Sequence, residues 1–458
     1  MTIVNVATPS IHASLGASGA ALQLVVGGYL IAVAMLLITG ARLGQAYGYR
    51  RAFLAGVCVF TLSSLACGLA PDPAVLIVAR VVQGAGAGVM FPQTFTGIQL
   101  HFAGADRIRA IGRYAMSLSA GAVSGQILGG VLVSANVAGL GWRVVFLVNV
   151  PVGVLAVVCA LRFLPADDAR RVRLDLKGVT LLSASVLLLI LPLTLGQSAG
   201  WPAWAWVCLA ASGPGIICFA KVERRVAAPL LNMHLLNLPV VRWGLITGAV
   251  ATSTYYALMF VLAQYLQGAL GFSPVASGLT LVPWVAAFGL AGQLVRRLPP
   301  SRWLPVAGCG LLAVAFAGAC AALLAGVGGA AGGPSWRTAA VLAPLLGIGG
   351  LGLGIEFATL IGRMTAAVEP KYAPDISGVS STVIQIGGSI GVAAVGALYL
   401  GQVRDPGHAF AAATAAMAAL AVVALLAATR ATRPRPQPQT ATGTAQAPAT
   451  RQFQESRR

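Results

Sequence analysis

Long apolar stretches recur along the whole chain, and each is close to the length that crosses a bilayer. A helix needs roughly 20 apolar residues to span a hydrocarbon core of ~30 Å. We place thirteen such segments at about 23–41, 52–70, 74–97, 114–135, 144–164, 178–197, 203–220, 244–267, 275–295, 304–326, 338–362, 378–401 and 408–429. With 58% hydrophobic and only 9% charged residues, the chain lacks the polar surface of a soluble domain. The sequence predicts an all-α integral membrane protein.

The first residues are also apolar, but they are too few to cross the membrane. Residues 1–9 extend over about 13 Å at 1.5 Å per residue, less than half of the hydrocarbon core. We interpret them as the end of a further span.

Basic residues alternate between the loops, and this alternation predicts the orientation. Lys and Arg in short loops are retained on the cytoplasmic side. The loops after the spans that begin at 23, 74, 144, 203, 275 and 338, together with the C-terminal tail, hold 26 of the 30 basic residues. The C-terminus is therefore expected in the cytoplasm. The net charge of +19 follows from topology, because a nucleic-acid surface would gather basic residues on one folded face.

Signs of catalysis or metal binding are missing from the sequence. It has no nucleophile motif, no phosphate-cradling loop and no pair of carboxylates in a helix, so neither an enzyme nor ATP-driven coupling is indicated. The seven cysteines and four histidines lack metal-ligand spacing, and we expect no metal and no cofactor. The tail, 430–458, is rich in Pro, Gln, Thr and Ala and is expected to be disordered.

Two charged residues lie deep inside apolar segments. Glu356 is the one acidic residue of the eleven in such a position, and Arg80 is its basic counterpart. A charge at a helix centre costs roughly 2.5 to 3.5 kcal/mol or more, so both are candidate functional residues. Glu356 lies in a glycine-rich apolar stretch that disfavours the charged form of a carboxyl group. The alternatives are that Glu356 bonds to a neighbouring helix or lies near the cytoplasmic end, and that Arg80 bonds to backbone carbonyls of a broken helix.

The string 40–51 resembles the loop signature of the major facilitator superfamily. It has the glycines Gly40 and Gly48 and the closing basic pair Arg50 and Arg51, but Gln45 occupies the acidic position. In that family the acid pairs with basic groups and a helix end to latch the outward-open state. A neutral hydrogen bond is about half as strong as a charge-assisted one, so we expect a looser latch. A tight cytoplasmic turn would explain the same residues.

The string 76–88 resembles the fourth-helix motif of that family. Arg80, Gln83 and Gly84 lie three and four residues apart, hence on one helical face, and Gly84 with Gly88 allows a neighbouring helix to approach closely. The resemblance implies that Arg80 faces the central cavity and tunes proton transfer.

The string 121–130 is similar to the fifth-helix signature of antiporters in the family. It contains Gly121, Gly125, Gly129 and Gly130, with Gln126 in place of the usual proline. Helix packing alone would also explain glycines spaced in this way.

Further strings at 142–153, 264–278 and 385–391 resemble the fourteen-span drug:proton antiporter branch, the EmrB/QacA-type exporters, and the likeness extends from residue 2 to about 399. In that branch the first helix carries an aspartate two positions before the residue that corresponds to Thr2. Here Met1 stands at the intervening position. We therefore expect a late start or a truncation, with the first helix partial. Glu356 is then the remaining membrane carboxylate for a proton.

The resemblance implies the major facilitator fold. We expect one helix bundle in 1–164, two additional central helices in 178–220, and a second bundle in 244–429, with six helices in each bundle. The implied function is proton-coupled export of lipophilic neutral or cationic small molecules by alternating access, with a role in antibiotic resistance, by a monomer in a bacterial plasma membrane.

Polar residues within the spans are candidates for the substrate cavity. They are Gln23, Tyr29, Gln83, Gln126, Asn149, Tyr255, Gln264 and Gln385. Each also fits an ordinary hydrogen bond between helices. For the whole chain, a proton-coupled uptake carrier and a non-transporting paralogue that acts as a sensor or scaffold remain alternatives.

Overall fold

The computed structural model describes residues 2–102, 104–165, 176–196, 199–225, 233–299, 301–327, 336–369, 373–402 and 404–433. Every regular element within these ranges is helical. Ten helical segments of this described part are long and apolar enough to cross a membrane, and two shorter apolar segments lie at 177–193 and 386–400. The prediction of an all-α membrane protein is confirmed, whereas the ten segments do not confirm fourteen spans.

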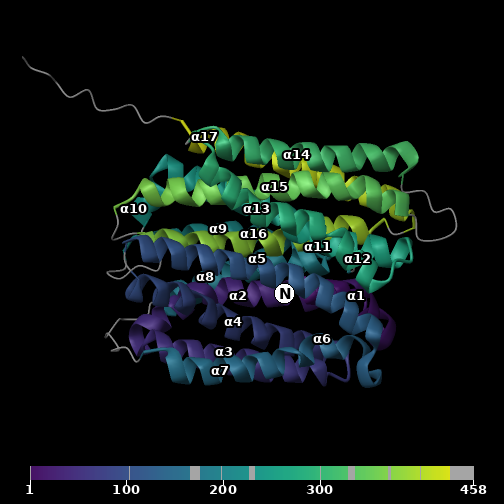
Figure 1. Ribbon diagram of the computed structural model, residues 1–458, viewed down its shortest axis with the longest axis horizontal. Coiled ribbons are helices and arrows are strands. Elements are labelled where there is room, and N and C mark those ends of the chain that lie inside the picture. Colours follow the sequence, from purple (N-terminus) through teal and green to yellow (C-terminus); the bar gives the residue numbers. More distant parts are fainter. Residues whose placement is uncertain are drawn as a thin grey trace, which may run out of the picture.

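The N-terminal half consists of seven α-helices joined by short turns. They are α1 Thr2–Leu15, α2 Gly19–Tyr47, α3 Tyr49–Gly68, α4 Pro73–His101, α5 Gly104–Ala135, α6 Val144–Leu147 and α7 Asn149–Phe163. Helix α4 packs against α2 and α3, α3 packs against α7, and α5 packs against α1 (Figure 1). The side chain of Asp72 caps α4 by accepting hydrogen bonds from the backbone N–H groups of Ala74 and Val75 at 2.8 and 2.9 Å.

The C-terminal half contains the second group of packed helices. They are α10 Met233–Leu236, α11 Pro239–Gln264, which continues into a π-helical turn Tyr265–Ala269, α12 Pro274–Thr280, α13 Val282–Arg297, α14 Leu304–Ala322, α15 Trp336–Ala366, α16 Ala373–Leu400 and α17 Pro406–Ala431. Helix α15 packs against α13 and α14, α14 against α17, and α11 against α16 and α17.

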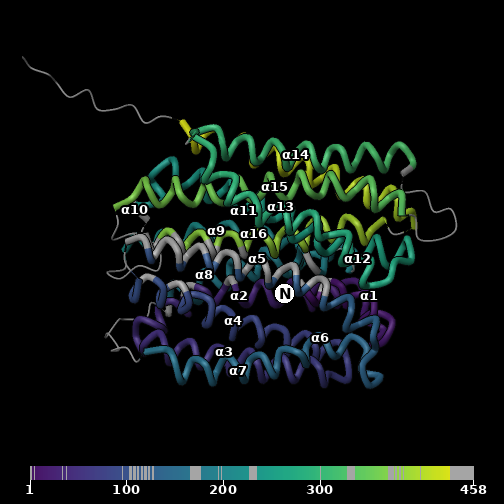
Figure 2. The backbone as a smooth tube through the Cα atoms, in the orientation of Figure 1, coloured from purple at the N-terminus to yellow at the C-terminus, as the bar shows by residue number. Residues whose placement is uncertain are grey.

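Two further helices, α8 Leu176–Leu195 and α9 Ala203–Glu223, lie between the halves in the sequence. They pack against each other, and α8 also contacts α2 and α16, one helix from each half. The tube in Figure 2 shows long helices of both halves, such as α7 and α14, running along the longest axis of the molecule.

The two halves meet through α2 with α16 and through α5 with α12 and α13. A Cβ atom built on Gly130, near the end of α5, would lie 2.7 Å from the Val275 Cα at the start of α12. One built on Gly19, at the start of α2, would lie 3.2 Å from a methyl group of Leu400 at the end of α16. These contacts lie at the end of the bundle that the basic residues predict to be extracellular.

Large apolar side chains fill the interior of the bundle and also cover its outer surface. On α7, for example, Val152 and Leu155 are 61% and 62% exposed. Helices satisfy their own backbone hydrogen bonds, so an apolar exterior of this kind is stable against lipid tails and would be costly in water. The fold therefore has the surface of a membrane protein.

Candidate functional site

Arg80 is held inside the N-terminal half by partners on two helices. It lies on α4, is 2% exposed, and its Nε donates a hydrogen bond of 2.8 Å to the backbone carbonyl of Val25 on α2. Its Nη1 donates to Oε1 of Gln83, one turn further along α4. The guanidinium carbon lies 4.2 Å from the centroid of the Tyr29 ring, a cation–π distance. The charge is thus fixed in position by hydrogen bonds and by an aromatic face.

The glycines on α4 permit this arrangement. A Cβ atom on Gly84 would collide with the backbone carbonyl oxygen of Tyr29, and one on Gly88 would lie 3.0 Å from that of Val33. Because α2 and α4 approach so closely, the Arg80 side chain reaches a carbonyl of α2.

Glu356 presents a different environment in the C-terminal half. It is 0% exposed on α15, and neither of its carboxylate oxygens has a hydrogen-bond partner in the described part of the chain. A backbone contact explains the tight packing here, since a Cβ atom on Gly308 of α14 would lie 2.7 Å from the Glu356 backbone nitrogen. The predicted alternative of a hydrogen bond to a neighbouring helix therefore has no counterpart among the described residues.

The depth of Glu356 follows from its place on α15. This helix has 31 residues, about 46 Å at 1.5 Å per residue, which exceeds the ~30 Å hydrocarbon core. Glu356 lies ten residues before the last residue of α15, Ala366, or about 15 Å from that end. The carboxyl group is therefore nearer to the middle of the helix than to its end.

Glu356 lines a narrow cavity between α11, α15 and α16. The cavity volume is about 10 Å³, and its lining residues are Gly244, Leu245, Gly248, Glu356, Phe357, Leu360, Ile361, Met364, Ser380 and Ile384. The hydroxyl of Ser380 is buried and, like the carboxyl group, has no partner among the described residues. Sequence reasoning missed Ser380, because Ser377, Ser381 and Thr382 stand beside it in the sequence and nothing distinguishes it from them.

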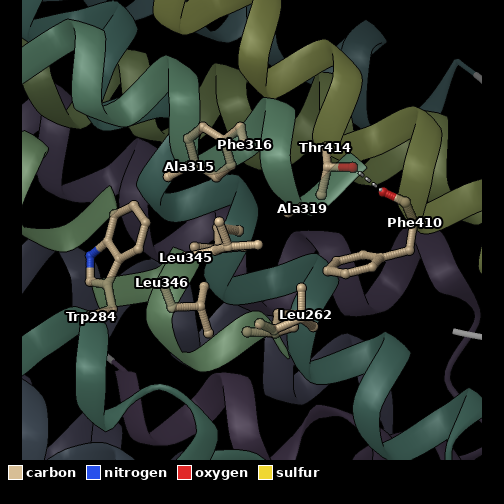
Figure 3. Close-up of a pocket in the computed structure, with 11 residues that line it drawn as sticks. Leu262, Trp284, Ala315, Phe316, Ala319, Leu345, Leu346, Phe410 and Thr414 are labelled. Atoms are coloured by element: carbon tan, nitrogen blue, oxygen red, sulfur yellow. Dashed lines mark hydrogen bonds between the residues drawn. The ribbon is translucent and has the colours of Figure 1, made fainter. Parts of the chain in front are cut away.

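A second cavity of about 10 Å³ lies within the C-terminal half and is apolar (Figure 3). The residues around it include Trp284, Phe316 and Phe410. Its one hydroxyl, that of Thr414, already donates to the Phe410 carbonyl at 3.0 Å. Neither cavity approaches the several hundred Å³ that a drug-sized ligand fills.

The remaining cavity candidates do not gather into one site. Asn149 donates a hydrogen bond of 3.0 Å to Ser64 and so ties α7 to α3. Tyr255 stacks on Trp284, with ring centroids 6.0 Å apart, and the half-buried Gln264 is the last residue of α11. Buried Gln23 lies where α2 meets α16, since a Cβ atom on Gly396 would be 3.2 Å from its Nε2. The side chains of Gln126 and Gln385 lie outside the described part of the structure.

The predicted loop motif forms the turn between α2 and α3. Gly48 has φ = 93°, a conformation that favours glycine, and Arg50 donates a hydrogen bond of 2.6 Å to the carbonyl of Leu161 at the end of α7. Gln45 is exposed and accepts a 3.1 Å bond from Arg42 of its own helix. Gln45 thus takes the place of the family's acid, and its hydrogen bond with Arg42 stays within α2.

Gln93 on α4 is a further residue that the sequence did not single out. Its buried Nε2 donates to the carbonyl oxygens of Gly40 at 2.7 Å and Val89 at 2.9 Å. A Cβ atom on Gly44 would overlap the Gln93 amide, so the glycine makes room for it. The sequence signal that could have indicated this contact is the pair Gly40 and Gly44, spaced by four residues, which makes room for a polar side chain on a neighbouring helix.

The glycines of α5 serve different contacts. A Cβ atom on Gly129 would lie 2.8 Å from Ile3 of α1, whereas Gly130 touches Pro274 and Val275 of α12. Around Gly121 there is open space, and Gly125 is half-buried. The half of the motif nearest the end of α5 therefore contributes to the contact between the two halves.

Comparison with known proteins decides the family. The sequence model of the Major Facilitator Superfamily matches residues 1–392. The chain belongs to this superfamily. It is 36% identical over 406 residues to a probable actinorhodin transporter of Streptomyces coelicolor, covering 87% of this chain and 69% of that protein. It is 38% identical over 404 residues to the cephamycin export protein CmcT of Amycolatopsis lactamdurans, covering 86% and 80% of the two chains.

A solved structure of a transporter homologue shares the fold. A bacterial homologue of the human lysosomal transporter Spinster, in an inward-facing and occupied conformation, matches with a TM-score of 0.62 at 18% identity, over 94% of this chain and 92% of that one. This chain is thus a multi-pass membrane transporter of the superfamily and not an enzyme, as predicted.

Proposed function

We propose that this protein exports lipophilic neutral or cationic small molecules of the antibiotic type, and that proton binding at Glu356 drives the cycle. Support for export comes from relatives named as an actinorhodin transporter and a cephamycin export protein, at 36% and 38% identity. The same proposal assigns the chain to the fourteen-span EmrB/QacA-type branch, with helix bundles in 1–164 and 244–429 and two central helices in 178–220. It also includes a cytoplasmic C-terminus, a monomeric state and a bacterial plasma membrane.

The observation that carries the coupling proposal is the buried carboxyl group without a partner. An isolated carboxylate in an apolar interior is very costly, whereas the neutral acid is tolerated. Neither oxygen of Glu356 finds a donor in the described part of the chain, so this arrangement suits the protonated form. Loss of the proton would create a charge that the surroundings do not satisfy, and a second arrangement of the helices would relieve it. Proton binding and helix movement are then linked.

The environment of Glu356 suits a proton better than a metal cation. Ca²⁺ takes six to eight oxygen ligands and Mg²⁺ requires about six. The side-chain oxygens that line the cavity are the two of Glu356 and the one of Ser380. Among the described residues there is also no group of three or more His, Cys, Asp or Glu placed to hold a metal ion.

The substrate is proposed to bind between the two halves in another state of the cycle. The two narrow cavities are too small for it, at about 10 Å³ each. The proposed contact residues are Gln23, Tyr29, Gln83, Gln126, Asn149, Tyr255, Gln264 and Gln385, and Arg80 supplies a fixed positive charge beside Tyr29. The halves touch near Gly130 and Gly19, so rocking about these contacts would open the opposite end.

The test is transport by purified protein in liposomes with an imposed pH gradient. Ethidium and Nile red serve as a cationic and an uncharged probe. We expect gradient-driven movement of at least one probe by the natural chain and none by Glu356→Gln. The matched control is Glu369→Gln, which alters an exposed acid just beyond α15 and should leave transport unchanged.

Gradient-driven transport by Glu356→Gln at the natural rate would refute the coupling proposal. Accumulation in the same direction as the proton flow would identify an uptake carrier. If neither probe is moved by the pH gradient, and if labelled probe does not exchange for unlabelled probe across the membrane, the non-transporting alternative would be favoured.

A further inference from the structure

The residues that line the small cavity beside Glu356 continue along α15 beyond the carboxyl group. Its lining residues on this helix extend from Glu356 to Met364, a distance of about 12 Å at 1.5 Å per residue. Met364 lies in the last turn of α15, which ends at Ala366. The lining of the cavity therefore extends from the buried carboxyl group toward the end of the bundle where α15 ends and α11 begins.

Helix α11 contributes two glycines to one wall of the cavity, and the space at one of them, Gly248, is unfilled. A Cβ atom on Gly248 would meet a single atom, Cγ1 of Ile384, at 3.9 Å, which is an ordinary contact. A Cβ atom on Gly244 would lie 2.6 Å from the Met364 sulfur. Gly248 thus leaves unfilled space next to Glu356, and a methyl group would enter it without a clash.

The opposite wall carries Ser380 of α16, whose hydroxyl is buried without a partner among the described residues. An unsatisfied buried hydroxyl destabilises the folded state, so its presence calls for an explanation. A hydroxyl both donates and accepts, and it can therefore bond to either form of a carboxyl group. Ser380 and Glu356 line the same cavity, which places the two unpartnered groups together.

We propose that this cavity is the path by which Glu356 exchanges its proton with the solution at the end of α15, and that Ser380 is a positioning residue for the carboxyl group. In the release step the O–H bond of the acid breaks, its proton bonds to a water molecule to give hydronium, and the carboxylate remains. Ser380 then donates a hydrogen bond to that carboxylate. The inference rests on the proposed function and adds the route and the side of the membrane.

The other titratable groups near this region lie outside the cavity lining. On the packed helices of the described structure they include Cys309 of α14, Arg363 of α15, Arg242 of α11, Arg296 and Arg297 of α13, and Arg430 of α17, which lies over the Trp243 ring of α11, while the side chain of Asp375 on α16 lies outside the described part. Among the residues that line the path, Glu356 is therefore the ionisable side chain and Ser380 is the one with a hydroxyl group.

The experiment compares proton flux with substrate exchange in liposomes that contain a pH-sensitive dye. Gly248→Ala fills the path, and Gly362→Ala is the control, because a Cβ atom at this exposed position on α15 meets nothing within 4 Å. We expect Gly248→Ala to slow ethidium-driven proton flux several-fold while exchange of labelled for unlabelled ethidium, at equal pH on both sides, continues. The control should match the natural protein in both assays.

The second pair of variants tests the hydroxyl. Ser380→Ala should slow proton flux between about twofold and tenfold, the range that one net hydrogen bond supplies. Ser380→Thr, which keeps the hydroxyl, should restore most of the flux. A residue needed only for packing would affect substrate exchange as well.

The failure of this inference differs from the failure of the proposed function. Natural proton flux in both Gly248→Ala and Ser380→Ala, with flux abolished by Glu356→Gln, would overturn the path and leave the coupling role of Glu356 intact. Continued flux in Glu356→Gln would overturn both.

Discussion

The two halves of the molecule each bury one charged residue, and they treat it in opposite ways. Arg80 in the N-terminal half donates hydrogen bonds to Val25 and Gln83 and lies over the Tyr29 ring. Glu356 in the C-terminal half has no partner for either oxygen among the described residues. Because a guanidinium stays protonated in proteins, Arg80 is a permanent charge, which the fold holds through Nε, Nη1 and the Tyr29 ring, while Nη2 has no partner among the described residues. A carboxyl group can lose its charge, so Glu356 is suited to change state during transport.

The largest expected effect is a difference in thermal stability between a variant of Arg80 and a variant of Glu356. Arg80→Met leaves the buried Gln83 oxygen without its donor and removes the bond to Val25, and each unsatisfied group costs about 1–3 kcal/mol. Glu356→Gln replaces one neutral side chain by another of similar shape. We expect a clearly lower melting temperature for purified Arg80→Met and little change for Glu356→Gln.

Arg225→Met is the control for the first variant, since Arg225 is exposed beyond the end of α9. Equal stability of Arg80→Met and the natural protein would remove the contrast between the halves.

The next effect concerns the contact that joins the halves. Gly130→Ala places a methyl group 2.7 Å from the Val275 Cα, and such overpacking typically costs about 1–3 kcal/mol. Gly121→Ala on the same helix has open space around it. Thermal unfolding should therefore show a lower midpoint for Gly130→Ala alone, and an equal loss in both variants would show that the glycines act through α5 itself.

A smaller effect on stability is expected when uncharged polar groups in the two halves are removed. Asn149→Leu removes a 3.0 Å hydrogen bond to Ser64, at a cost of about 0.5–1.5 kcal/mol. Ser380→Ala removes a hydroxyl that has no partner in the described structure, and we expect no loss of stability. Denaturation curves of the two variants would test this, and a loss for Ser380→Ala would show that its hydroxyl is bonded in the folded state.

The smallest effect is expected at the loop between α2 and α3. Gln45→Asp turns the exposed bond with Arg42 into an ion pair, which contributes less than about 1 kcal/mol at a surface. The measurement is the transport rate with and without added salt. A large salt-sensitive change would mean that residue 45 contacts a second helix during the cycle.

The helical membrane fold could be predicted from the apolar segments, because their length is set by the bilayer. The number of fourteen spans stays a prediction, because ten segments of the described residues are long and apolar enough to cross a membrane. Arg80 and Glu356 could also be selected from the sequence, because polar residues are costly in lipid, whereas Glu223 at the end of α9 is buried as well and was not selected. Their partners depend on packing between distant segments, as the Arg80 bond to Val25 and the neighbouring positions of Glu356 and Ser380 show.

The role of Glu356 is tested most directly by infrared difference spectroscopy of the purified protein before and after ethidium is added. The account predicts the absorption band of a protonated carboxyl group that weakens when ethidium binds and is missing from Glu356→Gln. Arg80→Lys, if it folds, should keep the band, because the proton resides on Glu356. A band that is unaffected by the Glu356→Gln substitution, or a spectrum of Glu356 as a carboxylate in every state, would contradict the account.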